Sequence, residues 1–144
     1  MSHSEHLNYF AYGSNMDLTQ MAERCPGAVL LGQGVLAGYR FGINPRGYAT
    51  VVADPTEQVL GLVWSITEAH RQTLDHFESV PDHYLPQQVA VGCADGVVRH
   101  MLIYTAVNAS PGVPQPGYLE KILAAARHQG FPSAYLERLS RWLR

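Results

Sequence analysis

The stretch "NYFAYGSNM" (residues 8–16) joins a short aromatic segment directly to a small polar turn. The apolar and aromatic run "LNYFAY" (residues 7–12) is typical of a β-strand. The residues that follow, 17–25, predict an amphipathic helix that ends at Pro26-Gly27. Its apolar positions have the spacing of one helix face and are Leu18, Met21, Ala22 and Cys25. The polar turn is therefore expected between a strand and a helix.

The turn Gly13-Ser14-Asn15 has two interpretations. At a helix N-terminus, successive backbone N–H groups have no intrahelical partner, and the helix dipole favours negative charge. Gly13 would let a ligand come close to the backbone, so the turn is a candidate cradle for a carboxylate. In the simpler interpretation, the side chain of Ser14 or Asn15 only caps the helix.

Strand and helix signals continue along the chain and predict an α+β fold. β-branched and aromatic residues predict strands at residues 28–43, 48–54, 57–66, 85–93 and 97–107. Helices are predicted at residues 68–78 behind an N-cap at Thr67, at 116–130 with Gly130 as C-cap, and from Pro132 as the first helical residue. Glycines at positions 34, 38, 42 and 61 indicate bulges or tight bends in the strands. We expect a curved, mostly β core with helices around it, in a single domain over residues 1–144.

The composition excludes several classes of protein. The 144 residues are 47% hydrophobic and 15% charged with a net charge of -2, and no basic stripe is present, so nucleic acid is not an expected partner. No signal peptide is recognisable, and no apolar run approaches the roughly 18 residues that span a bilayer, so no membrane partner is expected. Cys25 and Cys93 form no CxxC motif, which suits a reducing compartment. We expect a soluble, cytoplasmic protein in which both cysteines are small core residues.

The common signatures of cofactor, metal and nucleophile chemistry are missing. The sequence has no GxGxxG, P-loop or HExxH motif. Tyr12 stands where a GxSxG motif has its first glycine, so Ser14 is a poor candidate nucleophile. His3 and His6 are interpreted as part of a polar terminus, and the other histidines lack ligand spacing. We therefore expect no metal and no cofactor.

The stretch "LDHFESVPDHY" (residues 74–84) offers one candidate catalytic carboxylate. Leu74 and Phe77 are three residues apart and are expected to anchor one helix face in the core. Glu78 would then lie near the helix end, where orphan carbonyls oppose a negative charge and raise a carboxyl pKa. Such a carboxylate suits a general base, and the alternative is an ordinary exposed glutamate.

Four segments carry a resemblance to a known family. In order, "YFAYGSNM", "YATVVADPTEQVLGLVW", "LDHFESVPDHY" and "PGYLEKILAAARHQGFPSAYLERL" resemble the γ-glutamylcyclotransferase family over nearly the full length of the chain. The resemblance implies a small mixed β-barrel with flanking helices. It also implies a reaction in which the α-amino group of a γ-glutamyl amide attacks its own γ-carbonyl, closes 5-oxoproline and expels an amine. This proximity makes a cofactor or covalent intermediate unnecessary.

The resemblance also implies roles for individual residues. It assigns both proton transfers to Glu78, the glutamate after "LDxx". It assigns binding of the glutamyl group, largely through backbone groups, to Tyr9, Phe10, Ala11, Tyr12, Gly13, Ser14 and Asn15. Aromatic positions of the pocket would be Tyr84, Tyr104 and Tyr118. Arg46, in the loop "NPRGYAT", is an outside candidate for binding a distal carboxylate of the substrate.

One position departs from the family pattern, and several functions stay open. Ser79 stands where the family has a glycine, and a serine fits without strain only if its φ stays negative. The leaving group is open between amino acids, amines and a biosynthetic intermediate, with glutathione less expected. Other candidate functions are a non-catalytic module that holds an amino-acid-like ligand and an amidohydrolase. We expect a small-molecule partner and a monomer or homodimer.

Overall fold

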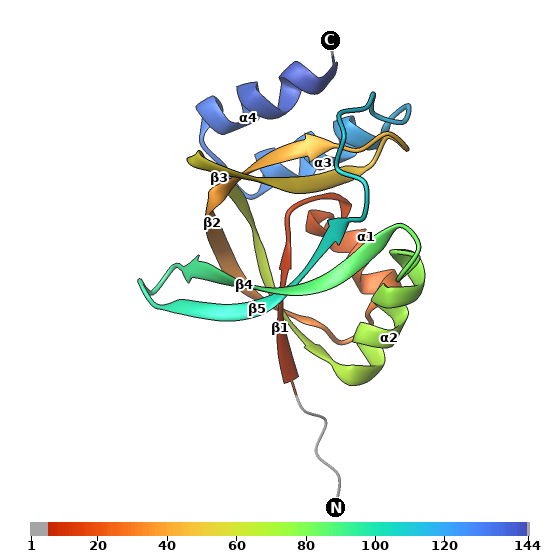
Figure 1. Ribbon diagram of the computed structural model, residues 1–144. Coiled ribbons are helices and arrows are strands. Elements are labelled where there is room, and N and C mark those ends of the chain that lie inside the picture. Colours follow the sequence, from red (N-terminus) through yellow and green to blue (C-terminus); the bar gives the residue numbers. More distant parts are fainter. Residues whose placement is uncertain (1–5, 144) are drawn as a thin grey trace, which may run out of the picture.

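A β-barrel forms the centre of the computed structural model, which describes residues 6–143 (Figure 1). The strands are β1 (His6–Ala11), β2 (Val29–Ile43), β3 (Ala49–Thr67), β4 (Tyr84–Cys93) and β5 (Val98–Ala106). The α-helices of the described residues are α1 (Leu18–Arg24), α2 (Glu68–Phe77), α3 (Tyr118–His128) and α4 (Ser133–Ser140). Two short 3₁₀ helices are η1 (Ser14–Met16) and η2 (Arg141–Leu143). The predicted α+β class is confirmed.

The barrel is closed in the order β1-β3-β2-β4-β5. Most neighbouring strands are antiparallel, whereas β1 and β5 pair in parallel and close the barrel at Tyr9 and Leu102. The barrel is therefore mixed, as the family resemblance implied. Figure 1 shows α3 and α4 beside the outer part of β2 and β3, and α1 and α2 together on another side.

The long hairpin of β2 and β3 corrects the predicted strand boundaries. The segments 48–54 and 57–66, expected as separate strands, form the single strand β3. The register jumps where Ala37 pairs with Gln58 but Tyr39 pairs with Ala53. Gly38 lies at this jump with a φ of 83°, so the predicted bend is present there. The chain keeps strand geometry through this bulge. The sequence pattern had predicted an end of the strand there.

Close packing around Phe10 explains two other glycines. Gly34 and Gly61 face each other across β2 and β3. A Cβ on Gly61 would lie 2.5 Å from the Ala11 carbonyl oxygen and 2.7 Å from Phe10 Cζ. The Phe10 side chain is fully buried in this space, and Ala11 is buried as well. Both residues build the barrel core and are not among the residues that line the pocket described below, so their predicted contact with substrate stays a prediction.

The helices agree with the sequence in position and differ in detail. Asp17 caps α1 by accepting a hydrogen bond from the Gln20 N–H, so the cap is neither Ser14 nor Asn15. The predicted apolar face of α1 is only half right, because Met21 and Cys25 are buried while Leu18 and Ala22 are exposed. Thr67 caps α2 as predicted, Pro132 is the N-cap of α4 rather than its first residue, and Gly130 follows the Gln129 C-cap of α3.

Three further expectations concern single residues. Leu74 is buried as predicted, but Phe77 is 50% exposed and does not anchor α2 in the core. Cys25 is buried, whereas Cys93 is only partly buried. His3 lies outside the described residues. Within residues 6–143, none of the helices is long and apolar enough to cross a membrane.

Candidate active site

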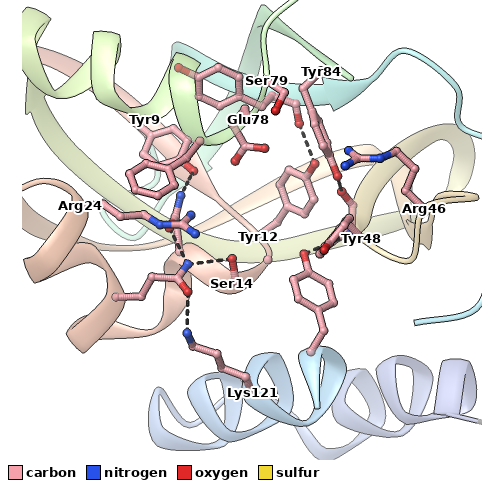
Figure 2. Close-up of a pocket in the computed structure, with 17 residues that line it drawn as sticks. Tyr9, Tyr12, Ser14, Arg24, Arg46, Tyr48, Glu78, Ser79, Tyr84 and Lys121 are labelled. Atoms are coloured by element: carbon pink, nitrogen blue, oxygen red, sulfur yellow. Dashed lines mark hydrogen bonds between the residues drawn. The ribbon is translucent and has the colours of Figure 1, made fainter. Parts of the chain in front are cut away.

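A pocket of about 320 Å³ opens beside the turn between β1 and α1 (Figure 2). It is lined by residues from β1, η1, α1, the start of β3, the end of α2, β4, β5 and α3. It brings together most of the predicted site residues, namely Tyr9, Tyr12, Gly13, Ser14, Asn15, Glu78, Tyr84, Tyr104 and Tyr118. Phe10 and Ala11 are the predicted site residues that it leaves out.

Glu78 is the C-cap of α2 and the acidic residue of the pocket lining. Figure 2 shows its carboxylate pointing into the pocket between Tyr9 and Tyr12. Burial of the carboxyl raises the pKa of Glu78 to about 7, and the nearby Arg24 guanidinium opposes this shift. The upward shift of the Glu78 pKa agrees with the prediction. Its main cause is the removal of water from the carboxyl, whereas the prediction had named the unpaired carbonyls at the helix end. A carboxyl with this pKa can both accept and donate a proton near neutral pH.

The backbone after Glu78 holds the residue in place with a left-handed turn. The Val80 N–H donates to the Asp75 carbonyl at 3.0 Å, and the Ser79 N–H donates to the His76 carbonyl at 3.1 Å. These two bonds form a Schellman motif, whose residue after the C-cap is usually glycine. Ser79 takes this position with a φ of 52°, so the condition of a negative φ is not met. Ser79 itself lines the pocket beside Glu78.

The polar turn Gly13-Ser14-Asn15 lines the pocket. Gly13 precedes η1, and a Cβ on it would lie 3.2 Å from Ala49 Cβ and 3.5 Å from the Tyr118 hydroxyl. The N–H groups of Ser14 and Asn15 are at the start of η1, where a helix provides no acceptor. Since Asp17 caps the following helix, these groups and side chains are not consumed as a cap. The simple N-cap interpretation is therefore wrong, and the cradle interpretation stays a prediction.

The tyrosines of the pocket differ in how their hydroxyls are bonded. Tyr12 donates to the Tyr104 carbonyl, Tyr84 donates to the Ala49 carbonyl and Tyr104 donates to the Asp75 carboxylate, each at 2.6 Å. Tyr9 and Tyr118 instead accept, from Asn15 Nδ2 and from the Ala49 N–H, each at 3.0 Å. Burial raises the pKa of each of these five tyrosines, so all of them stay protonated.

Basic side chains surround the pocket. The Arg24 guanidinium lies 4.2 Å from the centre of the Phe77 ring, and its Nη1 donates to Asn15 Oδ1 at 3.2 Å. Arg46 is exposed at the rim, with its guanidinium 5.5 Å from the centre of the Tyr48 ring. Lys121 reaches the pocket from α3. With Glu78 near half ionisation at neutral pH, the pocket has an excess of positive charge and suits an anionic ligand.

Comparisons with known proteins decide the family. The AIG2-like family matches residues 58–139. The chain is 30% identical to the bovine γ-glutamylcyclotransferase and 29% identical to the human one, with 94% of this chain and 78% of each relative covered. A solved γ-glutamyl cyclotransferase structure superimposes with a TM-score of 0.87 at 27% identity, covering 94% of this chain and 87% of the other. The chain belongs to the AIG2-like, γ-glutamylcyclotransferase family. It is therefore an enzyme of γ-glutamylcyclotransferase type.

Several lining residues of this γ-glutamylcyclotransferase pocket escaped sequence reasoning. They are Gln20, Arg24, Tyr48, Ala49, Phe77 and Lys121, together with Arg46, which was only an outside candidate. The exposed face of a predicted helix carries Gln20 and Arg24, and α3 carries Lys121, where charged residues normally face water. The sequence does offer one signal for Phe77. It directly precedes the candidate catalytic Glu78 at the end of the same helix, so it could have been predicted to lie near the pocket.

Proposed function

We propose that this enzyme converts a γ-glutamyl amide to 5-oxoproline and a free amine. The α-amino nitrogen of the substrate attacks the γ-carbonyl carbon, and the bond from this carbon to the amide nitrogen breaks. The α-ammonium nitrogen loses two protons as it becomes the ring N–H, one before the attack and one after it. Glu78 takes each proton in turn and passes it to the leaving nitrogen, which departs as an ammonium group, so the carboxylate is regenerated at the end of each cycle. The nucleophile is supplied by the substrate, and the pocket gains its effect from holding two groups of one molecule together.

The observation that carries this proposal is the position and pKa of Glu78. Its carboxyl enters a pocket that is otherwise lined by hydroxyl, amide and basic groups. A pKa of about 7 matches the two tasks of the residue, because the group is both a sufficient base and a sufficient acid near neutrality. The free N–H groups of Ser14 and Asn15 are suited to the negative oxygen that develops on the γ-carbonyl.

The charges around the pocket support an amino acid rather than a simple amine as leaving group. Among the residues that the structure describes, the Arg46 guanidinium has no ion pair, and it lies at the exposed rim. A carboxylate on the leaving group could pair with this cation. The enzyme should therefore prefer γ-glutamyl-alanine to γ-glutamyl-ethylamine, which is the same molecule without the second carboxylate. We expect Arg46→Met to lower kcat/KM for the first substrate about tenfold and to leave the second unchanged, as measured by 5-oxoproline release.

The deciding experiment is 5-oxoproline release from γ-glutamyl amino acids and γ-glutamylamines, with the natural chain compared to Glu78→Gln. The substitution keeps the size of the side chain and removes its proton transfer. We expect turnover by the natural chain, loss of at least a thousandfold in kcat for the variant, and a raised melting temperature of the variant with substrate. A variant that retains turnover would overturn the role of Glu78.

The same assay separates the other candidate functions. An amidohydrolase would release glutamate instead of 5-oxoproline, because water rather than the α-amino group attacks the carbonyl. A module that only holds a ligand would show the ligand-dependent rise in melting temperature in both proteins and no turnover in either. The position of Glu78 in the pocket favours cyclisation over both.

A further inference from the structure

Two side-chain amides next to the pocket are oriented by cations. Lys121 Nζ donates to Gln20 Oε1 at 2.5 Å, and Arg24 Nη1 donates to Asn15 Oδ1 at 3.2 Å. Ammonium and guanidinium groups can only donate hydrogen bonds. The amide oxygens must therefore face Lys121 and Arg24, and the amide nitrogens must face the other way. The two cations thus determine the direction of these hydrogen bonds.

The two amide nitrogens donate hydrogen bonds to two hydroxyl groups. Gln20 Nε2 donates to Ser14 Oγ and to Asn15 Oδ1, each at 2.8 Å. Asn15 Nδ2 in turn donates to the Tyr9 hydroxyl at 3.0 Å. Each hydroxyl oxygen therefore accepts a bond from the network. Within residues 6–143, neither hydroxyl donates a hydrogen bond to the protein, so both hydrogens are uncommitted.

Three other hydroxyls of the pocket are bonded in the opposite sense, whereas the Tyr118 hydroxyl accepts from the Ala49 N–H as Tyr9 accepts from Asn15. The hydroxyl hydrogens of Tyr12, Tyr84 and Tyr104 are already used on carbonyl or carboxylate oxygens of the protein. These residues can offer a ligand only their rings and the lone pairs of their oxygens. Tyr9 and Ser14 lie on the same wall of the pocket as the cradle turn and are left as donors.

We infer that Gln20, held by Lys121, is a positioning residue that leaves the Tyr9 and Ser14 hydroxyls as hydrogen-bond donors for acceptor oxygens of the substrate. The inference rests on the proposed function and deepens it, because it states which side of the substrate meets this wall. A carboxylate or the γ-carbonyl oxygen accepts from these hydroxyls, whereas the α-ammonium group cannot. The ammonium group cannot use these two hydrogens, and Glu78 is the carboxylate of the pocket lining with which it can pair.

The inference is tested by reversing the polarity of one amide. Gln20→Glu keeps the shape of the side chain but has only acceptors near neutral pH. Ser14 must then donate to residue 20, which consumes its hydroxyl hydrogen inside the protein. Asn15 Oδ1 loses the Gln20 Nε2 donor and meets a carboxylate oxygen instead, so the Asn15 amide no longer holds the Tyr9 hydroxyl in a fixed direction. We expect kcat/KM for γ-glutamyl-alanine to fall at least tenfold, while the melting temperature changes by only a few degrees.

A matched control separates polarity from charge. Thr19→Glu adds the same charge one residue earlier, at an exposed position of α1; within residues 6–143 the Thr19 side chain makes no hydrogen bond to either amide. We expect this variant to keep at least half of the natural kcat/KM.

A double-mutant cycle shows whether the effect passes through the hydroxyls. In a Tyr9→Phe, Ser14→Ala background, the hydroxyl hydrogens of residues 9 and 14 are already absent. Gln20→Glu should then cost less than threefold, compared with at least tenfold in the natural chain. An equal cost in both backgrounds would overturn the inference and leave the proposed function intact.

The two proposals fail in different ways. If the natural chain releases 5-oxoproline and Gln20→Glu is equally active, only the positioning role is wrong. If the natural chain neither turns over γ-glutamyl-alanine nor binds 5-oxoproline by calorimetry, both proposals are wrong. Activity in the natural chain with a loss confined to Gln20→Glu supports both.

Discussion

Glu78 carries the largest electrostatic cost that we identify in the site. Its carboxyl is removed from water, and the Arg24 guanidinium only partly offsets the cost of ionising it. The residue lies at the end of α2 and inside the pocket, where the proposed reaction needs a base. Because ionising the buried Glu78 carboxyl is unfavourable, the free energy of unfolding should fall as the pH rises and the group loses its proton.

The first prediction concerns the free energy of unfolding of Glu78→Gln. In the folded protein the pKa of Glu78 is about 7, compared with 4.5 for the ordinary group, so the folded state binds the extra proton between these values. Stability from this group is therefore complete below about pH 4.5, falls as the pH rises, and is lowest above pH 7. Glu78→Gln should be more stable than the natural chain at pH 8 by up to about 3 kcal/mol, at about 1.4 kcal/mol per unit of pKa shift.

Urea denaturation at pH 4 and pH 8 measures this difference. At pH 4 the two proteins should unfold at the same urea concentration, because the glutamate is neutral in both states. A natural chain that is more stable than the variant at pH 8 would contradict the burial of the charge. Glu68→Gln at the exposed start of α2 is the control, since that carboxylate faces water.

The second prediction concerns the backbone of Ser79. A left-handed conformation costs a non-glycine residue about 1–2 kcal/mol, and glycine removes this cost while losing more chain entropy on folding. Ser79→Gly should therefore raise the free energy of unfolding by about 0.5–1 kcal/mol. Ser110→Gly, in an exposed loop without a positive φ, should lower it slightly. A loss of stability in Ser79→Gly would show that the serine side chain offsets the strain.

At the level of elements, the closeness of β1 and β3 limits the side chains that fit between them. Gly61 of β3 lies against the Ala11 carbonyl and the Phe10 ring of β1, at distances that a methyl group cannot occupy. Backbone atoms cannot move aside as a flexible side chain can. The glycine is therefore required by packing, although its φ is ordinary.

The third prediction is that Gly61→Ala destabilises the protein by about 1–3 kcal/mol, the range for overpacked cores. The control is Gly92→Ala in β4, where an added Cβ would meet only the Val35 carbonyl at an ordinary 3.7 Å. Thermal or urea unfolding of both variants measures the difference. Equal stability of the two variants would contradict the close approach of β1 and β3.

At the level of the whole molecule, barrel and helices are joined through the pocket. The Tyr118 hydroxyl of α3 accepts from the Ala49 N–H of β3 at 3.0 Å, and Lys121 of α3 donates to Gln20 of α1. A site assembled from both ends of the chain requires all of its elements to be folded together. This arrangement argues for a single cooperative domain.

The fourth prediction is that the barrel and the C-terminal helices unfold in one transition. The chain has two tryptophans, Trp64 inside β3 and Trp142 in η2, so Trp142→Phe and Trp64→Phe each leave one fluorescent probe. The unfolding midpoint of each variant by fluorescence should equal its midpoint by far-UV circular dichroism. Earlier unfolding seen only at Trp142 would show that the C-terminal helices form a separate unit.

The sequence by itself determined the elements and the place of the candidate base. Thr67 and the apolar spacing after it predict α2, because helix caps and helix faces depend on residues within a turn or two of one another. Glu78 at the end of α2, the polar turn after β1 and most of the strands follow from the same short-range patterns. These features need no knowledge of what packs against them.

Only the tertiary structure decided what surrounds these elements. Phe10 is a core residue and Phe77 a pocket residue, although both are apolar, because a pattern of apolar residues does not state which neighbour covers each one. The positive φ of Ser79 arises from hydrogen bonds that close the end of α2. The bond between Lys121 and Gln20 spans 101 residues, and the polarity of the pocket hydroxyls depends on it. Such long-range contacts exist only once the barrel has closed and α3 has packed beside it.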